Sequence, residues 1–264
     1  MDCKLKKMQK IEYEILCYVD KFCNDNNITY FLSGGSCLGA VRHNGFIPWD
    51  EDIDIMMSRK DYDRFVDSFS KIDNCKYAVG AIETNKLWTR NYAKVWDKDT
   101  VLKNKKLDEV QMGVFIDVFP IDGLPSGAAG RFFHIWKIKI IHAIRNSAKR
   151  KAILKNDKYK LAKIILKIIS LPFNERKLTE VIDKEIRKYD YDKSTYVGAI
   201  SAVHYWHKEI FEKKIFAEAK NVKFEDGMFP IPVGADTYLQ QLYGDYWIIP
   251  KSNTNHIDNW EVYI

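Results

Sequence analysis

The spacing of apolar residues predicts a chain that begins with a helix and continues through a series of short strands. In residues 4–24 apolar side chains recur every three to four positions, which is typical of an amphipathic helix. A capping-box sequence at 58–61 predicts another helix directly after it. Apolar or alternating runs between turn-forming residues predict strands at 28–32, 52–57, 75–82, 90–96, 99–103 and 114–120.

After residue 126 the pattern changes to basic helices and then to an aromatic-rich region. Apolar residues at helical spacing predict helices within 132–144, 161–169 and 176–188. Further on, prolines make 229–233 extended, and 235–242 should form a helix. We therefore predict an α+β fold with a strand-rich core at 1–126, a basic helical subdomain at 127–195, and a C-terminal region at 196–264 that packs back on the core.

Two carboxylates in the strand at 52–57 suggest a metal site. If Ile53 and Ile55 point into the core, the period of two places Asp52 and Asp54 together on the opposite face. Like charges held close raise each other's pKa and are costly without a counter-ion. Two such carboxylates suit a hard divalent cation.

A glycine-rich turn stands before this acidic strand. Gly34, Gly35 and Ser36 follow the strand at 28–32 and should start a short helix that runs to Val41. Glycine allows a ligand to approach the backbone closely, and the N–H groups at a helix start suit a phosphate. An ordinary turn explains the same three residues, and only their position before the acidic strand favours a phosphate site.

A third carboxylate, Asp117, lies alone within the apolar strand at 114–120. A buried aspartate is costly unless it is paired or binds a metal ion. A salt bridge to a buried Lys or Arg is the simpler explanation, but the metal site suggested by Asp52 and Asp54 needs a third ligand, and this favours a metal ligand. Asp61 and Asp63 fit the N-terminal turn of the next helix, so we assign them no catalytic role.

Charge is distributed unevenly along the 264 residues, whose formal net charge is +6. Residues 131–170 hold twelve Lys or Arg and one acid, so this segment carries +11 and the remaining chain −5. A solvated lysine face on a helical subdomain explains the excess most simply. The functional alternative is a surface that binds an anionic membrane or a lipid-linked polyanion.

The sequence also bears on the cell compartment. A lysine-rich helix follows Met1 without the apolar core of a signal peptide, and no apolar run is long enough to span a membrane. The five cysteines are scattered and form no C-x-x-C pair, as is usual for reduced thiols. We expect a cytoplasmic protein, peripheral at the inner membrane face if the basic segment binds lipid.

The stretch from Leu38 to Asp54, LGAVRHNGFIPWDEDID, resembles the signature of the LicD/fukutin family of phosphotransferases. The resemblance continues at 93–100 and 113–125, and in the later segments 230–234 and 242–246. It therefore covers most of the chain outside the basic helices.

This resemblance implies a nucleotidyltransferase-like fold, in which helices flank a mixed β-sheet core. It places Gly35 and Ser36 at a phosphate-binding turn, Asp52 and Asp54 on the metal, and Asp117 as the third carboxylate. Bacterial family members transfer phosphocholine from CDP-choline to sugars of teichoic acid or lipopolysaccharide, and animal relatives transfer ribitol phosphate from CDP-ribitol. It thus implies a lipid-linked glycan or teichoic acid precursor as the acceptor.

The residue chemistry agrees with such a reaction. Phosphoryl transfer depends on positioning and charge neutralisation, so Mg²⁺, or Mn²⁺, on Asp52 and Asp54 would neutralise the diphosphate. Asp117 is a metal ligand or a general base toward the acceptor hydroxyl. The remaining candidates are Arg42 and Lys94 as phosphate contacts and Trp49, Tyr205 and Trp206 as choline-binding aromatics, although core packing is the simpler role for each aromatic.

Four other functions agree less well with the sequence. An EF-hand-like calcium loop fails because its sixth and twelfth positions are Ile55 and Asp61 rather than Gly and Glu. A D-x-D glycosyltransferase normally has a larger sheet before its motif. A non-catalytic binding protein would not need all three acids, and nucleic-acid binding by the basic segment is disfavoured by the long match at 38–54. Choline, ethanolamine and ribitol donors all stay open.

Overall fold

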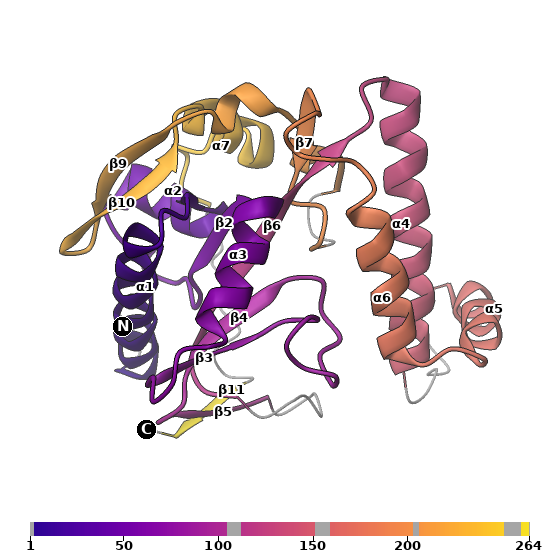
Figure 1. Cartoon of the computed structure of the whole chain (residues 1–264), viewed down its shortest axis with the longest axis horizontal. Coiled ribbons are helices and arrows are strands. Elements are labelled where there is room, and N and C mark those ends of the chain that lie inside the picture. Colours follow the sequence, from indigo (N-terminus) through magenta and orange to yellow (C-terminus); the bar gives the residue numbers. More distant parts are fainter. Residues whose placement is uncertain (1–2, 105–111, 151–158, 203–205, 251–259, 264) are drawn as a thin grey trace.

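The computed structural model describes residues 3–104, 112–150, 159–202, 206–250 and 260–263 (Figure 1). Its centre is a mixed sheet in the order β1-β2-β6-β4-β3, formed by Tyr30–Leu32, Asp54–Ser58, Phe115–Leu124, Ala93–Asp97 and Tyr77–Gly80. β2 and β6 are parallel, and the other pairs along this path are antiparallel. The expected α+β class with a mixed sheet is therefore confirmed.

Helices α1 (Cys3–Asp25) and α3 (Arg59–Phe69) cover the sheet. α1 contacts β4 and β6, and α3 contacts β2, β3 and β6. The side chain of Ser58 accepts a hydrogen bond from the Asp61 amide, as the capping-box sequence predicts. The apolar stripe of each helix is buried, and it includes Ile15, Leu16 and Val19 of α1 and Tyr62, Phe65 and Phe69 of α3.

Part of the C-terminal region packs on the beginning of the core. The hairpin β9 (Ala219–Phe224) and β10 (Gly227–Pro232) contacts α2 (Gly34–His43) and β1, and α7 (Ala235–Tyr243) also contacts α2. The helix expected at 235–242 is therefore confirmed. Segments that lie some 200 residues apart in the sequence enclose the start of α2.

The basic segment folds into three helices beside the sheet. They are α4 (Ala128–Lys149), α5 (Lys160–Ser170) and α6 (Glu175–Ile186), and α4 contacts both α5 and α6 (Figure 1). A small apolar core of their own joins α4 and α6 to the end of β6; it contains Leu124, Ile138, Ile182, Ile186 and Ile200. Burial of these residues explains the helical spacing in the sequence.

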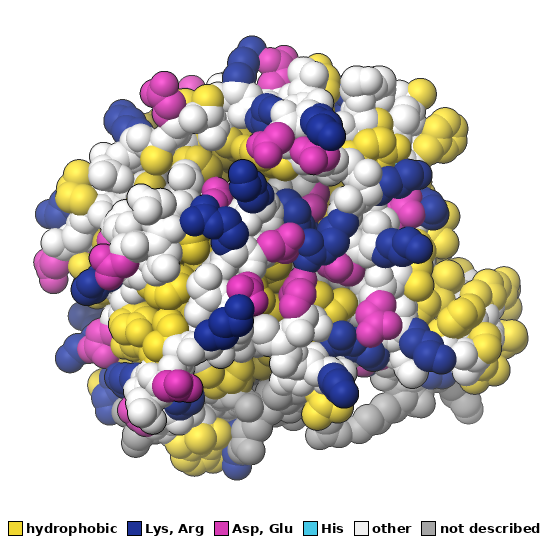
Figure 2. Space-filling view, viewed as in Figure 1, with side chains coloured by type: hydrophobic (Ala, Val, Ile, Leu, Met, Phe, Trp, Pro, Cys, Tyr) yellow, Lys and Arg dark blue, Asp and Glu magenta, His cyan; other side chains and the backbone are white. Residues whose placement is uncertain are grey.

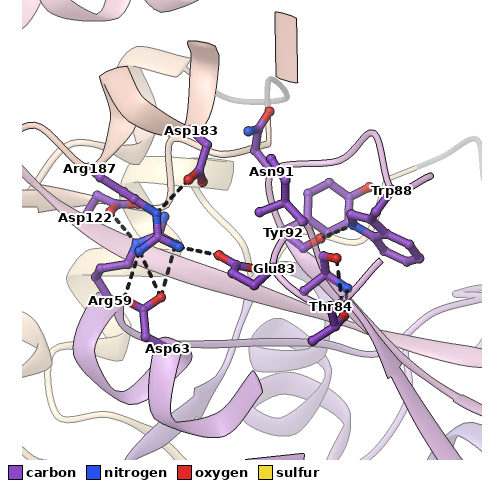
Figure 3. A network of polar contacts seen from close by, with 12 residues as sticks. Arg59, Asp63, Glu83, Thr84, Trp88, Asn91, Tyr92, Asp122, Asp183 and Arg187 are labelled. Carbon is purple, nitrogen blue, oxygen red and sulfur yellow. Dashed lines mark hydrogen bonds and ion pairs between the residues drawn. The ribbon is translucent and has the colours of Figure 1, made fainter. Parts of the chain in front are cut away.

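A polar network fixes α6 to the sheet and α3. Arg187, just after α6, forms ion pairs with Asp63 of α3, with Glu83 and with Asp183 (Figure 3). Beside it, Arg59 donates two hydrogen bonds of 2.7 Å to the buried carboxylate of Asp122 on β6. Asp63 therefore serves this network, which agrees with its exclusion from the catalytic candidates.

Some elements differ from those expected. Asp52 lies before β2, which begins at Asp54, so the alternation argument does not describe it. β5 (Val101–Asn104) pairs with β11 (Trp260–Tyr263), while β7 (Tyr196–Gly198) joins the end of β6 and β8 (Phe211–Glu212). β7, β8, β9 and β11 were not predicted. Within the described residues, no helix has the length and apolar character needed to cross a membrane.

Candidate active site

Three charged residues form a row across neighbouring strands. Asp54 of β2 stands opposite Asp117 of β6 in the parallel pair, and Asp117 stands opposite Lys94 of β4 in the antiparallel pair. The Lys94 ammonium donates a short hydrogen bond to the Asp117 carboxylate and lies 3.4 Å from the centre of the Phe115 ring. Asp117 therefore has both an acidic neighbour and a buried cation.

The start of α2 lies against two carboxylates. A Cβ atom added to Gly35 would lie 2.6 Å from Asp50 Oδ2, and one added to Gly34 would lie 3.3 Å from Asp54 Oδ2. Gly34 also has a φ of +49°, which side-chain-bearing residues rarely adopt. The two glycines thus permit the acidic loop to approach the backbone closely. Ser36 supports the arrangement because its Oγ accepts a 2.8 Å hydrogen bond from the Asp54 amide.

These groups line a cavity of about 580 Å³. Its acidic wall comes from the loop before β2 and from β6, and segments after α6 form the opposite wall. A larger hollow of about 1220 Å³ lies between α3, β3 and α6, but acids there are already paired with Arg187. The smaller cavity is therefore the candidate active site; it is lined by Ser33, Gly34, Gly35, Asp50, Asp52, Asp54, Tyr92, Asp117, Phe119, Ala199, Ala202, Glu209 and Tyr243.

The acidic wall brings several carboxylates close together. Burial, followed by the charge of Asp52, raises the pKa of Asp50 to about 8, and the Asp50 and Asp52 side chains share a hydrogen bond. The pKa of Asp54 is also raised, first by burial and then by Asp52 and Asp117. Burial lowers the pKa of Lys94, whereas Asp117 favours its charged form. Lys94 thus lies beside a group of neighbouring carboxylates.

The carboxylates that line the cavity are chemically suited to bind a divalent cation. Clustered carboxylates with raised pKa values are stabilised when a hard cation replaces their shared protons. Among the residues that the structure describes, however, no group of three or more His, Cys, Asp or Glu side chains is arranged so as to hold a metal ion. Asp117 is already bonded to Lys94. Asp52 and Asp54 as metal ligands, and Asp117 as a third, remain predictions.

The other predicted site residues are distributed unevenly. Gly35 lines the cavity, and Ser36 and Lys94 are buried directly beside it. Arg42 is absent from the cavity lining, and its guanidinium donates a 2.6 Å hydrogen bond to the carbonyl of Tyr246. Trp49 is also absent from the lining; it packs against the core and lies edge-on to His43.

The two remaining aromatic candidates cannot be placed in the cavity. Tyr205 lies outside the described residues. Trp206 begins the 3₁₀ helix η1 (Trp206–Glu209), and its side chain is likewise outside the description. Aromatic faces in the cavity come instead from Tyr92, Phe119 and Tyr243.

Sequence reasoning missed several acids of the site. Glu12 of α1 is buried, its Oε2 atom makes no hydrogen bond among the described residues, and burial and the charges of Asp52 and Asp50 raise its pKa. Glu209 lines the cavity opposite the acidic loop, and burial raises its pKa to about 7. An acid on the apolar face of α1 was the available signal for Glu12, whereas Glu209 follows an unremarkable helix pattern.

Gly35→Ala should weaken the site without unfolding the protein. The new methyl group would lie 2.6 Å from Asp50 Oδ2, so that the carboxylate must move. A displacement of this size at a reacting centre lowers activity on the order of 10²-fold. Steady-state transfer rates and the melting temperature check this. Gly127→Ala is the matched control because nothing lies within 4 Å of its added Cβ atom, and equal losses in both variants would contradict the argument.

Comparison with known proteins decides the family. Residues 27–168 match the family described as "LicD/FKTN/FKRP, nucleotidyltransferase domain", and this range contains the whole acidic wall. The chain is also 32% identical to the lipopolysaccharide cholinephosphotransferase LicD of Haemophilus influenzae, over 93% of this chain and 92% of that protein. The chain belongs to the LicD family.

Similarity to the animal members of the LicD family is more local. Ribitol 5-phosphate transferase FKRP of mouse and of human is 35% identical over 71 residues, which is 27% of this chain and 12% of each relative. The match to the Haemophilus relative instead extends through nearly the full length of both chains. The family resemblance expected from residues 38–54 is therefore confirmed.

Proposed function

We propose that this LicD-family protein transfers phosphocholine from CDP-choline to a sugar hydroxyl of a cell-surface glycan precursor, of the lipopolysaccharide or teichoic acid type. The juxtaposition of Asp54 and Asp117 beside the glycine-rich start of α2, inside one cavity, carries the proposal. The near full-length similarity to a lipopolysaccharide cholinephosphotransferase supports the choice of phosphocholine.

The reaction breaks one bond of the donor diphosphate and forms one new ester. The acceptor oxygen attacks the phosphorus that carries choline, the bond from that phosphorus to the CMP oxygen breaks, and the acceptor proton passes to a base. Mg²⁺ or Mn²⁺ held by Asp52 and Asp54 would neutralise the charge on the phosphate oxygens. The start of α2 would also stabilise the negative charge of the phosphate, because its backbone N–H groups and helix dipole favour an anion.

Lys94 and Asp117 act together in this proposal. Lys94 is buried behind Asp117 and bonded to it, so that the carboxylate is held in one orientation. The Lys94 ammonium also offsets part of the negative charge that gathers at the donor site. Asp117 is thus a positioned carboxylate, while direct contact of Lys94 with phosphate stays a prediction from the sequence.

The aromatic residues of the cavity suit the choline group. A quaternary ammonium is bound by the faces of aromatic rings. Tyr92, Phe119 and Tyr243 line the cavity beside the carboxylates, whereas Trp49 does not. We therefore propose the former three for choline in place of Trp49.

Glu209 is the better-placed general base. Glu209 and Asp117 both line the cavity, but Asp117 is already bonded to Lys94. A base works best when its pKa is close to the working pH, and burial raises that of Glu209 to about 7.

A pH profile tests Glu209. Because the base acts when ionised, the transfer rate should rise as pH increases through about 7 and then level off. Glu209→Gln should lower kcat by roughly 10²-fold and flatten this rise, with a smaller effect on KM for the donor. Glu212→Gln, at the exposed residue of β8, is the control. An unchanged pH profile in Glu209→Gln would exclude the role.

A donor panel tests the proposed function. The protein is incubated with Mg²⁺, acceptor glycan and CDP-choline, CDP-ethanolamine or CDP-ribitol in turn, and CMP release is followed. We expect the highest kcat/KM with CDP-choline. The FKRP similarity makes ribitol phosphate transfer the second candidate, and preferred use of CDP-ribitol would establish it. CMP release from none of the three donors would contradict both.

A further inference from the structure

Helices α4 and α5 present apolar side chains outward. On α4, Phe133 is 70% exposed, and Phe132, Trp136 and Ile140 form a stripe with the i, i+4, i+8 spacing of one helix face. On α5, Leu161 is 78%, Ile165 57% and Ile168 60% exposed. Figure 2 shows hydrophobic side chains gathered along the edge of the molecule where these two helices lie. We call this surface the α4–α5 face.

The orientation of α5 is opposite to that of an ordinary surface helix. An amphipathic helix normally buries its apolar stripe and exposes its lysines. In α5 the apolar residues are the more exposed ones, whereas Lys167 turns inward and donates hydrogen bonds to the carbonyls of Ser147, Ala148 and Arg150 at the C-terminal end of α4. These bonds hold α5 with its apolar side to solvent.

Positive charge accompanies the exposed apolar residues. α4 and α5 contain no Asp or Glu, and of their eight Lys or Arg several are engaged elsewhere: Lys167 turns inward, and Lys137 and Lys149 pair with acids of α6. The exposed face keeps cations such as Lys139. Lys139 lies 4.8 Å above the Trp136 ring. Aromatic and aliphatic residues interleaved with cations are the composition of surfaces that bind in the headgroup region of anionic bilayers.

We propose that the α4–α5 face docks on an anionic lipid bilayer. Apolar side chains such as Phe133 and Ile165 enter the headgroup region, and the basic residues meet the lipid phosphates. A second copy of the chain is the weaker occupant, because a symmetric dimer would place this acid-free face against itself. The face thus has the charge that complements lipid and repels its own copy.

Docking in this orientation places the cavity near the membrane surface. Phe132 and Trp136 also line a groove of about 600 Å³ with His207 and Ile210. Glu209, between these last two residues in the chain, lines the catalytic cavity. One short segment therefore separates the α4–α5 face from the cavity, which suits an acceptor that is itself anchored in lipid.

Vesicle flotation tests the docking without donor or acceptor, so that its result is independent of the proposed reaction. The full chain is mixed at low salt with vesicles of phosphatidylcholine alone or with 30% phosphatidylglycerol, a composition of roughly the charge found in anionic membranes. We expect flotation with the anionic vesicles and at least tenfold less with the neutral ones. Failure to float with anionic vesicles would overturn the proposal.

Two matched variants locate the binding surface. Ile165→Glu with Ile168→Glu changes two exposed residues of α5 and should reduce flotation at least tenfold with an unchanged melting temperature. Leu87→Glu with Met228→Glu adds the same charge at residues of similar exposure elsewhere and should float like the wild type. Equal flotation of both variants would overturn the proposal. So would a dimer, seen by light scattering, that only the α5 variant dissociates.

Discussion

Asp54→Asn is expected to reduce phosphocholine transfer by roughly 10²–10³-fold, the usual loss when one charged group that stabilises a transition state is removed. Asp54 lies against Gly34 at the start of α2 and stands opposite Asp117 in the sheet, so its carboxylate links the glycine turn to the acidic wall of the proposed donor site. Asparagine has nearly the same shape but no charge. The measurement is the steady-state rate with CDP-choline and acceptor.

The melting temperature distinguishes this loss of activity from misfolding of the variant. Because burial and neighbouring acids raise the pKa of Asp54, its ionised form costs stability as pH rises above the unfolded value. Asp54→Asn removes that cost, so its melting temperature at pH 8 should equal or exceed that of the wild type. Asp67→Asn, at an exposed residue of α3, is the activity control. A variant at Asp54 that unfolds easily, or that retains full activity, would contradict the assignment.

Arg59→Met is expected to lower the free energy of unfolding by about 3–5 kcal/mol, since it leaves a buried charge without its partner. Asp122 has a side chain only 1% exposed and receives two hydrogen bonds from Arg59. Burial already raises the pKa of Asp122, and the Arg59 charge opposes that rise. Without Arg59 the ionised carboxylate is strongly disfavoured, so the loss should be largest at pH 8 and shrink as pH falls and Asp122 protonates.

Chemical denaturation at pH 5 and pH 8 measures this effect. Lys60→Met on the same helix is the control, because Lys60 is exposed and its replacement should change stability by less than about 0.5 kcal/mol. The double variant Arg59→Met with Asp122→Leu should recover much of the loss, since neither charge then remains buried. A loss in Arg59→Met that is independent of pH would exclude the unpaired Asp122 as its cause.

The local sequence pattern was sufficient to predict much of the core. The acidic strand, the capping box at Ser58 and the strand around Asp117 depend on spacing over fewer than ten residues, and each occurs near the predicted position. That Asp117 would stand beside Asp54 needed the family resemblance, because pairing of strands 60 residues apart leaves no local signal. The salt bridge considered for Asp117 is present, since Lys94 pairs with it, and this acid also lines the cavity. Its role as a metal ligand stays a prediction.

Contacts distant in the sequence account for what was missed. Arg42 and Trp49 lie in the motif, but the fold directs Arg42 to the carbonyl of Tyr246 and packs Trp49 on the core. Glu12 comes from α1 and Glu209 from η1. The position of Glu12 on the apolar face of its helix was a local signal, whereas nothing in the neighbourhood of Glu209 distinguishes it from a surface acid. β11 pairs with β5 across some 160 residues, so neither hydrophobic period nor turn chemistry indicates the pair.

The central claim is that the carboxylate cavity transfers phosphocholine to glycan. Its most direct test follows labelled CDP-choline with Mg²⁺ and lipopolysaccharide that lacks phosphocholine, or a teichoic acid precursor, using the wild type, the wild type with a chelator, and Asp52→Ala. We predict that the wild type forms CMP and labelled glycan in equal amounts, and that both are lost with the chelator and in Asp52→Ala. Equal product from Asp52→Ala and the wild type, or no labelled glycan from either acceptor, would contradict it.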